Sequence, residues 1–191
     1  MMRRKILCAL VIVVAFAGIS EAAKRKVAAK KVVDDRARNI YALFTEVNPK
    51  LSGVDAKKYA EIILEAGEKH KVDPYVIAAI IVHESTVNNK AVSKGGDYGL
   101  MQVRWKVHEK AIKKEFPKVK KANDMFDART NIFFGTEIFA YGYKKSGNDV
   151  RKGILRYSAG NTQLADKVMA TVKKLQANDA KTNKTPKKKG K

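Results

Sequence analysis

The fold of this chain is decided by residues 84–102, which read ESTVNNKAVSKGGDYGLMQ. The stretch opens with Glu84 at the end of an apolar run and continues through a loop of small polar residues. It returns to a hydrophobic pattern at Gly99, Leu100 and Met101. We therefore expect the rest of the chain to be organised around this stretch, with Glu84 as the candidate for chemistry.

A buried helix is predicted directly before the loop. Asp73 can accept hydrogen bonds from the free N–H groups of a first helical turn, and Pro74 fits the first helical position. The following residues, 75–82, are almost entirely apolar. A helix that is apolar on every face is buried on nearly all sides, so this helix should lie in the core.

Glu84 falls on the apolar face of that helix. Helical spacing from Ile77 leads to Ile80, Ile81 and Glu84. A carboxyl group on such a face is poorly solvated, and desolvation raises its pKa because it disfavours the ionised form. A carboxylic acid that stays protonated near neutral pH can donate a proton to a leaving oxygen, so Glu84 is a candidate general acid. From periodicity alone, a glutamate that merely ends the helix at the surface is an equal alternative.

The segments around this helix also have helical periodicity. Apolar residues recur three and four positions apart in several segments, namely residues 35–47, 55–71, 100–116, 131–145, 149–157 and 162–177. Alternation of period two is missing, apart from one candidate strand pair near residues 93–98. We predict an all-α fold of about six to seven helices, formed as a single domain by residues 35–177.

Three ordered segments match the signatures of a known family. They are the Glu-Ser, Ala-x-Ser and Gly-Leu-Met-Gln positions of residues 84–102, DARTNIFFG at 127–135, and YSAGN at 157–161. Together they resemble the bacterial lytic transglycosylases related to the soluble lytic transglycosylase (SLT) domain. The resemblance implies a lysozyme-like fold. The chain departs from the family pattern at Val87, Asn89, Ala128 and Ser158, none of which is the proposed acid.

The resemblance implies a peptidoglycan lytic transglycosylase. Such an enzyme cleaves the β-1,4 bond between N-acetylmuramic acid (MurNAc) and N-acetylglucosamine (GlcNAc) and forms a 1,6-anhydromuramoyl product, without a cofactor. Glu84 would act as acid and then as base. By the same resemblance, four residues would contact the sugar, namely Ser93, Met101, Gln102 and Tyr157. Four more would support the site, namely Ser85, Asp97, Gly99 and Asn161.

Two of these residues have alternative roles. Met101 follows Leu100 and is equally expected to be a core residue. Asp97 lies in a Gly-Gly-Asp-Tyr-Gly turn, where a hydrogen bond to nearby N–H groups is the favoured role. If Asp97 instead faces the cleft, it could hold a water, and the protein would be a muramidase like the goose-type lysozymes, whose signatures are similar.

The N-terminus predicts a secretory signal peptide over residues 1–23. A basic segment precedes the apolar residues 6–19, and cleavage is expected near Ala22 or Ala23. The mature protein would be periplasmic or secreted, and it would contain no cysteine because Cys8 is the only one. The alternative is an uncleaved membrane anchor, although the apolar run is shorter than a membrane span requires.

Both ends of the chain are basic and contribute to a formal net charge of +21. We predict a basic linker at 24–34 and a disordered Lys-rich tail at 178–191. These segments suit anionic envelope polymers or lipids, which leaves a non-catalytic polyanion-binding protein as an alternative function. No specific nucleic-acid partner is expected, because no aromatic residues are interleaved with the tail lysines. The histidines His70, His83 and His108 lack a ligand spacing, so no metal site is expected. The protein is predicted to be a monomer.

Overall fold

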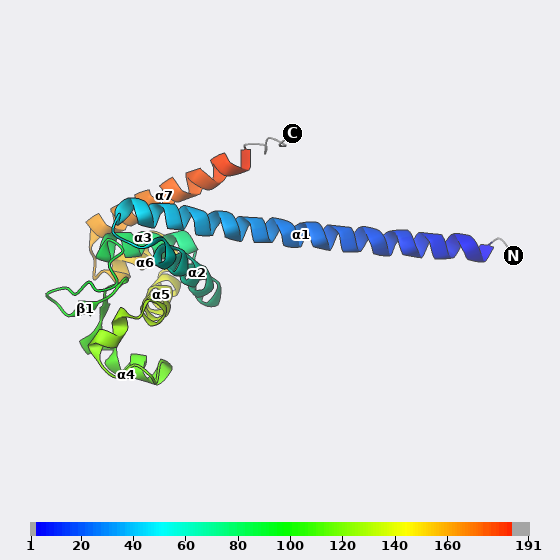
Figure 1. The fold of residues 1–191 in the computed structure, drawn as a ribbon. Coiled ribbons are helices and arrows are strands. Elements are labelled where there is room, and N and C mark those ends of the chain that lie inside the picture. The colour runs from blue at the N-terminus through cyan, green and yellow to red at the C-terminus, as the bar shows by residue number, and fades with distance from the viewer. Residues whose placement is uncertain (1–2, 185–191) are drawn as a thin grey trace. The chain divides into compact units, whose positions relative to one another are not determined.

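The computed structural model describes the backbone of residues 3–184 and the side chains of residues 23–33 and 35–181. The chain divides into two compact units, residues 1–35 and 36–191. The first unit contains the N-terminal part of helix α1 (Arg3–Val47). The second unit contains the end of α1 and all the remaining elements (Figure 1).

The second unit is almost entirely helical. After α1 come α2 (Gly53–His70), α3 (Pro74–Ser85), β1 (Asp97–Tyr98), β2 (Val103–Arg104), α4 (Trp105–Glu115), the 3₁₀ helix η1 (Ala122–Phe126), α5 (Ala128–Lys145), α6 (Val150–Tyr157) and α7 (Thr162–Lys184). The prediction of an all-α fold with about six to seven helices is confirmed for the part of the chain that the structure describes.

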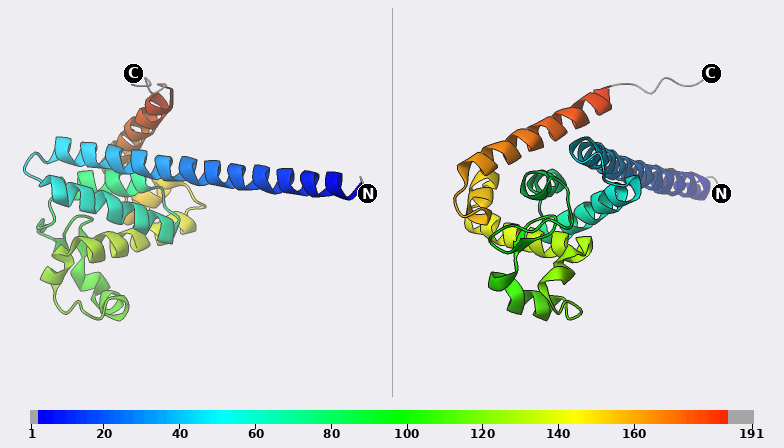
Figure 2. Two further views of the ribbon diagram at one scale, coloured as in Figure 1. Left: turned by 45° about the vertical axis from the view of Figure 1, so that its right-hand side comes forward. Right: turned by 60° about the vertical axis from the view of Figure 1, so that its left-hand side comes forward.

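Helix α3 forms the centre of the core. The Asp73 side chain accepts a hydrogen bond from the Tyr75 N–H (3.0 Å) and Pro74 is the first helical residue, so the predicted start is confirmed. Every residue from Tyr75 to Val82 is buried. Helices α2 and α7 pack against α3, and the right-hand view of Figure 2 shows α3 end-on with other helices around it. Each buried aliphatic side chain contributes roughly 1.5–3 kcal/mol, so this helix is a large part of the fold's stability.

The strand pair lies slightly later in the chain than expected. Strands β1 and β2 are antiparallel, with Asp97 opposite Arg104 and Tyr98 opposite Val103. The turn between them occupies residues 99–102, so helix α4 begins at Trp105 and not directly after Gly99. The hairpin places two opposite charges across from each other beside the end of α3.

The segment predicted as a linker is helical. Residues 24–34 belong to α1, which is continuous from Arg3 to Val47. Lys, Arg and Ala have high helix propensities, and this composition favours a helix even without an apolar face to bury. The predicted signal peptide lies mostly outside the described side chains, which begin at residue 23. Within the described helices, no segment combines the length and apolar content needed to span a membrane.

The predicted disordered tail begins too early. Helix α7 continues past Ala177 to Lys184, so residues 178–184 are helical. Residues 185–191 lie outside the described residues. The physical reason for the longer helix is a polar contact that the sequence pattern does not display, made by Asp179.

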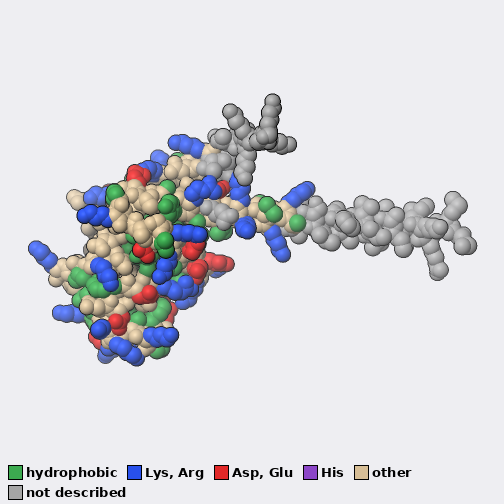
Figure 3. Space-filling model, viewed as in Figure 1, with side chains coloured by type: hydrophobic (Ala, Val, Ile, Leu, Met, Phe, Trp, Pro, Cys, Tyr) green, Lys and Arg blue, Asp and Glu red, His purple; other side chains and the backbone are tan. Residues whose placement is uncertain are grey.

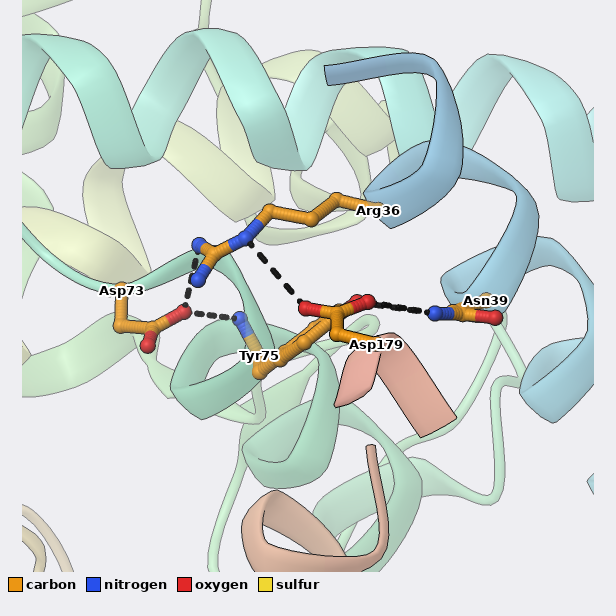
Figure 4. Close-up of polar contacts among 5 residues, drawn as sticks. All are labelled: Arg36, Asn39, Asp73, Tyr75 and Asp179. Atoms are coloured by element: carbon orange, nitrogen blue, oxygen red, sulfur yellow. Dashed lines mark hydrogen bonds and ion pairs between the residues drawn. The ribbon is translucent and has the colours of Figure 1, made fainter. Parts of the chain in front are cut away.

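Asp179 joins the end of α7 to α1 and α3 (Figure 4). Its carboxylate accepts hydrogen bonds from the Tyr75 hydroxyl (2.5 Å) and from Asn39 Nδ2 (2.7 Å). Arg36 lies 3.9 Å from Asp179 and donates to Asp73 (3.0 Å), the residue that caps α3. The start of the core helix is therefore held by residues from both ends of the domain.

Truncation after Ala177 should destabilise the domain. It removes Asp179 and leaves the buried Tyr75 hydroxyl without its acceptor, which is expected to lower the free energy of unfolding by about 1–3 kcal/mol. Truncation after Lys184 keeps this contact and serves as the control. Thermal melts of the two truncated proteins test the expectation, and equal melting temperatures would contradict it.

Candidate active site

Glu84 lies at the C-terminal end of α3, beside a cleft of about 430 Å³. The helix ends here because Thr86 and Val87 both adopt left-handed backbone conformations, with φ of 51° and 59°. Such values are strained for a β-branched residue, so the chain turns away from α3 at some energetic cost. The carboxyl group of Glu84 is consequently placed at the rim of the core and at the wall of the cleft.

The surroundings of Glu84 favour its protonated form. Burial raises the pKa of Glu84 to about 7, and the nearby negative charge of Asp97 acts in the same direction. Within the part of the chain that the structure describes, no group donates a hydrogen bond or forms an ion pair with this carboxyl. The desolvation that the sequence predicted is therefore present, and the carboxylic acid faces the cleft without a competing protein partner.

Asp97 lines the same cleft, but its surroundings favour the ionised form. Its two oxygens accept hydrogen bonds from Arg104 Nε (2.6 Å) and Nη2 (3.0 Å), and Ser93 Oγ donates a third (2.6 Å). These contacts lower the pKa of Asp97. A carboxylate that is held ionised and is saturated with donors is a weak base towards water.

The structure places Asp97 in a turn and at the cleft, but the acceptor for the N–H groups of the turn is Ser93 Oγ and not the Asp97 carboxylate. Ser93 Oγ accepts hydrogen bonds from the N–H groups of Gly95 (3.1 Å) and Asp97 (3.1 Å), so Asp97 belongs to a hydrogen-bonded turn. Asp97 also faces the cleft as a fixed negative charge. Glu84 and Asp97 form a pair of carboxyl groups whose environments separate their pKa values, which is the arrangement expected of one proton donor and one charge stabiliser.

The turn at residues 99–102 needs glycine at its first position. Gly99 has φ +77°, and a Cβ there would lie 2.7 Å from the Met125 carbonyl oxygen and would overlap the Asn131 amide. Gln102 lines the cleft, and its Nε2 donates to the carbonyl oxygens of Gly99 (2.9 Å) and Ala91 (3.2 Å). Gln102 thus fixes the loop that passes beside Glu84.

Asn131 is a structural residue of the site that the sequence analysis did not assign. It is fully buried in α5, where its Oδ1 accepts the Met101 N–H (2.7 Å). Its Nδ2 donates to the carbonyl oxygens of Tyr98 (2.8 Å) and Met125 (3.0 Å). The signal was present, because Asn131 is an amide directly before the apolar residues 132–134 of a predicted helix. A buried amide needs several hydrogen-bond partners, and here backbone groups on either side of the loop supply them.

Two of the expected sugar-contacting residues do not line the cleft. Met101 is fully buried and its sulfur lies 3.8 Å from the Thr136 hydroxyl, so the alternative role as a core residue describes it. Ser93 uses its hydroxyl to hold Asp97. Their contributions are to the shape of the loop and not to the lining of the cleft.

Of three further expected residues, Tyr157 and Asn161 line the cleft and Ser85 lies directly after Glu84 in α3. Tyr157 lines the cleft and its hydroxyl donates to the Met101 carbonyl oxygen (2.6 Å), which ties α6 to the loop. Asn161 also lines the cleft, and its Oδ1 accepts the Leu164 N–H (3.0 Å) at the start of α7. Ser85 is buried and its hydroxyl donates to the Ile81 carbonyl oxygen (3.1 Å), as expected for a residue that steadies the backbone beside the acid.

Several cleft residues were not predicted as parts of the site. They are His83, Val103, Arg104, Val107, His108, Ile138, Ser158, Ala159 and Leu164. Burial lowers the pKa of His83 and of His108, so both rings are neutral near pH 7. Among the described side chains, no group of three or more His, Cys, Asp or Glu residues could hold a metal ion.

Replacing Glu84 by Gln should stabilise the fold at high pH. Below about pH 4.5 the carboxyl is protonated in both the folded and the unfolded chain, so its ionisation has no effect. As the pH rises towards 7, the unfolded chain ionises first and the wild type loses stability, by up to about 3 kcal/mol above pH 7. In urea unfolding, the free energy of unfolding of Glu84→Gln should exceed that of the wild type by more at pH 8 than at pH 5.

The control for that experiment is Glu61→Gln, which changes an exposed glutamate of α2. It should give no comparable gain. A stability difference between Glu84→Gln and the wild type that is the same at pH 5 and pH 8 would contradict the desolvation of Glu84.

The chain is similar to known proteins in sequence and in fold. The family described as "Transglycosylase SLT domain" matches residues 61–180. Membrane-bound lytic murein transglycosylase E of Buchnera aphidicola is 31% identical over 107 residues, which are 53% of this chain and 47% of that protein. Membrane-bound lytic murein transglycosylase C of Salmonella typhimurium is 35% identical over 108 residues, which are 54% of this chain and 29% of that protein.

The fold is similar to that of a solved structure. The 70 kDa soluble lytic transglycosylase of Escherichia coli superposes with a TM-score of 0.52 at 22% identity, over 76% of this chain and 24% of that chain. At this identity the similarity supports the fold alone. The match covers less than half the length of each of these relatives.

Proposed function

Because the chain belongs to the transglycosylase SLT domain family, we propose that it is a lytic transglycosylase that cleaves peptidoglycan glycan strands. The bond broken is the β-1,4 linkage between MurNAc and GlcNAc, and the product ends in 1,6-anhydromuramic acid. The observation that carries the proposal is Glu84, whose pKa is raised to about 7 and whose carboxyl faces the cleft without a protein partner. Most glycoside hydrolases need two free carboxyl groups, whereas this chemistry needs one.

In the first step Glu84 acts as the general acid. It donates its proton to the glycosidic oxygen, the bond from that oxygen to C1 of MurNAc breaks, and GlcNAc leaves with a free 4-hydroxyl. Positive charge develops on the MurNAc ring as this bond breaks. The fixed negative charge of Asp97, which lines the same cleft, favours that charge and is already oriented by Arg104.

In the second step Glu84, now ionised, acts as the base. It takes the proton of the MurNAc 6-hydroxyl while the 6-oxygen bonds to C1 and closes the anhydro ring. Glu84 is protonated again and no water is consumed. The 6-hydroxyl belongs to the same sugar ring, and a tethered nucleophile can have an effective molarity far above that of bulk water.

The structure supports a narrower set of sugar contacts than the family resemblance implied. Gln102 and Tyr157 line the cleft and are assigned to the substrate. Ser93 and Met101 are assigned to the loop, because the hydroxyl of one is used by Asp97 and the other is fully buried. This division predicts that sugar binding depends more on Gln102 than on Met101.

The proposed location is the cell envelope, either periplasmic or secreted. The predicted signal peptide and the wall substrate both require export. The chain has 40 Lys and Arg residues against 19 Asp and Glu residues, and Figure 3 shows Lys and Arg side chains spread over the visible face. We assign this charge to attraction by anionic envelope polymers or lipids, with the protein acting as a monomer.

A second candidate is a goose-type-lysozyme-like muramidase. The observation in its favour is that Asp97 lines the cleft together with Glu84, where a carboxylate could hold a water. The three donors on the Asp97 oxygens weigh against it, because they lower the basicity of the carboxylate. The transglycosylase is therefore preferred. A non-catalytic polyanion-binding protein would not need a carboxyl group with a raised pKa in its cleft, so this alternative is not preferred.

Glu84→Gln should abolish wall degradation while the protein stays folded. Glutamine keeps the size of the side chain but cannot deliver a proton, and general acid catalysis typically contributes about 10²–10⁴-fold in rate. The release of soluble fragments from purified peptidoglycan measures the loss, with Glu61→Gln as the matched control. Activity of Glu84→Gln close to that of the wild type would remove Glu84 from its role.

The mass of the products separates the transglycosylase from the muramidase. Transglycosylation adds no water at each cut, whereas hydrolysis adds one, so mass spectrometry of the released fragments should find anhydro ends. Asp97→Asn should still give anhydro products. Its activity should decline at a lower pH than that of the wild type, because removal of the Asp97 charge lowers the pKa of Glu84. Hydrolysed products that disappear in Asp97→Asn would instead establish the muramidase.

A further inference from the structure

Two further cavities lie along α5 and α6, next to the cleft at Glu84. A second cavity of about 460 Å³ shares three lining residues with the cleft, namely Ile138, Tyr157 and Ala159. A third cavity, of about 510 Å³, shares three lining residues with the second, namely Lys145, Leu155 and Arg156. The three cavities therefore lie next to one another along α5 and α6, and we call the second and third together the groove.

Two glycines allow α5 and α6 to form the floor of this groove. A Cβ at Gly142 would lie 3.2 Å from Arg156 Cβ, and a Cβ at Gly153 would lie 3.1 Å from Tyr143 Cα. Larger side chains at these positions would push the helices apart. The close approach sets the stem of Arg156 directly over α5, so its guanidinium emerges beside the groove.

The groove is basic. Its lining includes Lys145, Lys152 and Arg156, whereas neither the second nor the third cavity is lined by a described Asp or Glu residue. The cleft itself, by contrast, contains Glu84 and Asp97. The charged residues that line the groove are therefore all basic, whereas in the cleft the charge of Asp97 is paired with that of Arg104.

Arg156 is held in place without a carboxylate partner among the described residues. Its Nε donates to Ser146 Oγ (3.0 Å), and that hydroxyl donates to the Gly142 carbonyl oxygen (2.8 Å). Lys145 lies over the ring of Tyr141 (5.8 Å), whose side chain is 68% exposed. The Arg156 guanidinium is therefore fixed by a single acceptor, Ser146 Oγ, and its remaining N–H groups are available to a ligand.

We propose that this basic groove binds carboxylate groups of the peptides that are attached to the glycan strand. The inference rests on the proposed function, because it takes the glycan strand to lie in the cleft at Glu84. It adds to that function a preference for strands that carry peptides over bare strands.

Two arguments favour peptide carboxylates as the ligand. The peptide is attached to MurNAc, the sugar whose bond would be cleaved, so glycan binding in the cleft would present the peptide to the groove at high effective concentration. Carboxylates also match the available donors, since a guanidinium binds a carboxylate through two parallel hydrogen bonds. Free anionic polymers of the envelope lack the covalent connection to the sugar in the cleft.

Binding of free peptides tests the proposal without relying on catalysis. The probe is the mixture of wall peptides released by an amidase, and the measurement is calorimetry at low salt. The double variant Lys145→Gln, Arg156→Gln should bind the peptides about 10-fold more weakly than the wild type, because it loses charge-assisted hydrogen bonds. The control Lys57→Gln, Lys58→Gln removes two charges from exposed positions of α2 and should bind like the wild type.

Methyl esterification of the peptides completes the binding test. It removes the carboxylate charges and should weaken binding to the wild type to the level of the double variant. Binding that survives esterification would overturn the proposal, as would equal weakening in the double variant and the control, or no binding by the wild type. Thermal melts of both variants confirm that they are folded.

Activity on two substrates keeps the proposal separate from the proposed function. Glycan strands with their peptides should be cleaved faster than the same strands after amidase treatment, and the double variant should lose this preference while it still cleaves bare strands. Equal cleavage of both substrates by the wild type would overturn the inference and leave the transglycosylase intact. Failure of the wild type to cleave either substrate would instead contradict the proposed function.

Discussion

A carboxyl group at the end of a fully buried helix cannot be solvated as it would be in water. In this protein Tyr75 to Val82 are buried on every side, and Glu84 follows on the same face. The burial raises the pKa of Glu84 to about 7, so ionisation of this carboxyl lowers the free energy of unfolding. Stability and chemistry are therefore in conflict at this position, as is common at active sites.

The rest of the domain holds this helix and shapes the loop opposite its acid. Asp179 and Asp73 fix the beginning of α3 through contacts with the two ends of the domain. Asn131 holds the loop from within the core, and the ion pair of Asp97 with Arg104 fixes its outer edge. The start of α3 and the loop beside Glu84 are thus fixed by hydrogen-bonded polar side chains, which is the preorganisation that electrostatic catalysis requires.

Sequence patterns predicted the parts of the site that depend on residues close to one another along the chain. The cap at Asp73 and the apolar face bearing Glu84 follow from spacing along one helix. The roles of Asn131 and Asp179 depend on partners 30 or more positions away, and periodicity carries no information about such pairs. Met101 was assigned to the sugar by the family resemblance, whereas its side chain packs in the core, which is the alternative that its position after Leu100 had left open. Residues 24–34 are helical although they have no apolar periodicity, because their Lys, Arg and Ala residues favour a helix by propensity alone.

The most direct test of the central claim is the titration of the Glu84 carboxyl group by carbon-13 NMR. Comparison with Glu84→Gln assigns the signal, and the folded wild-type protein is followed from acid to alkaline pH. Glu84 should titrate with a pKa of about 7, and its pKa should fall in Asp97→Asn because the neighbouring negative charge is gone. A pKa near 4.5, unchanged by the Asp97 substitution, would contradict the assignment of Glu84 as a proton donor at neutral pH.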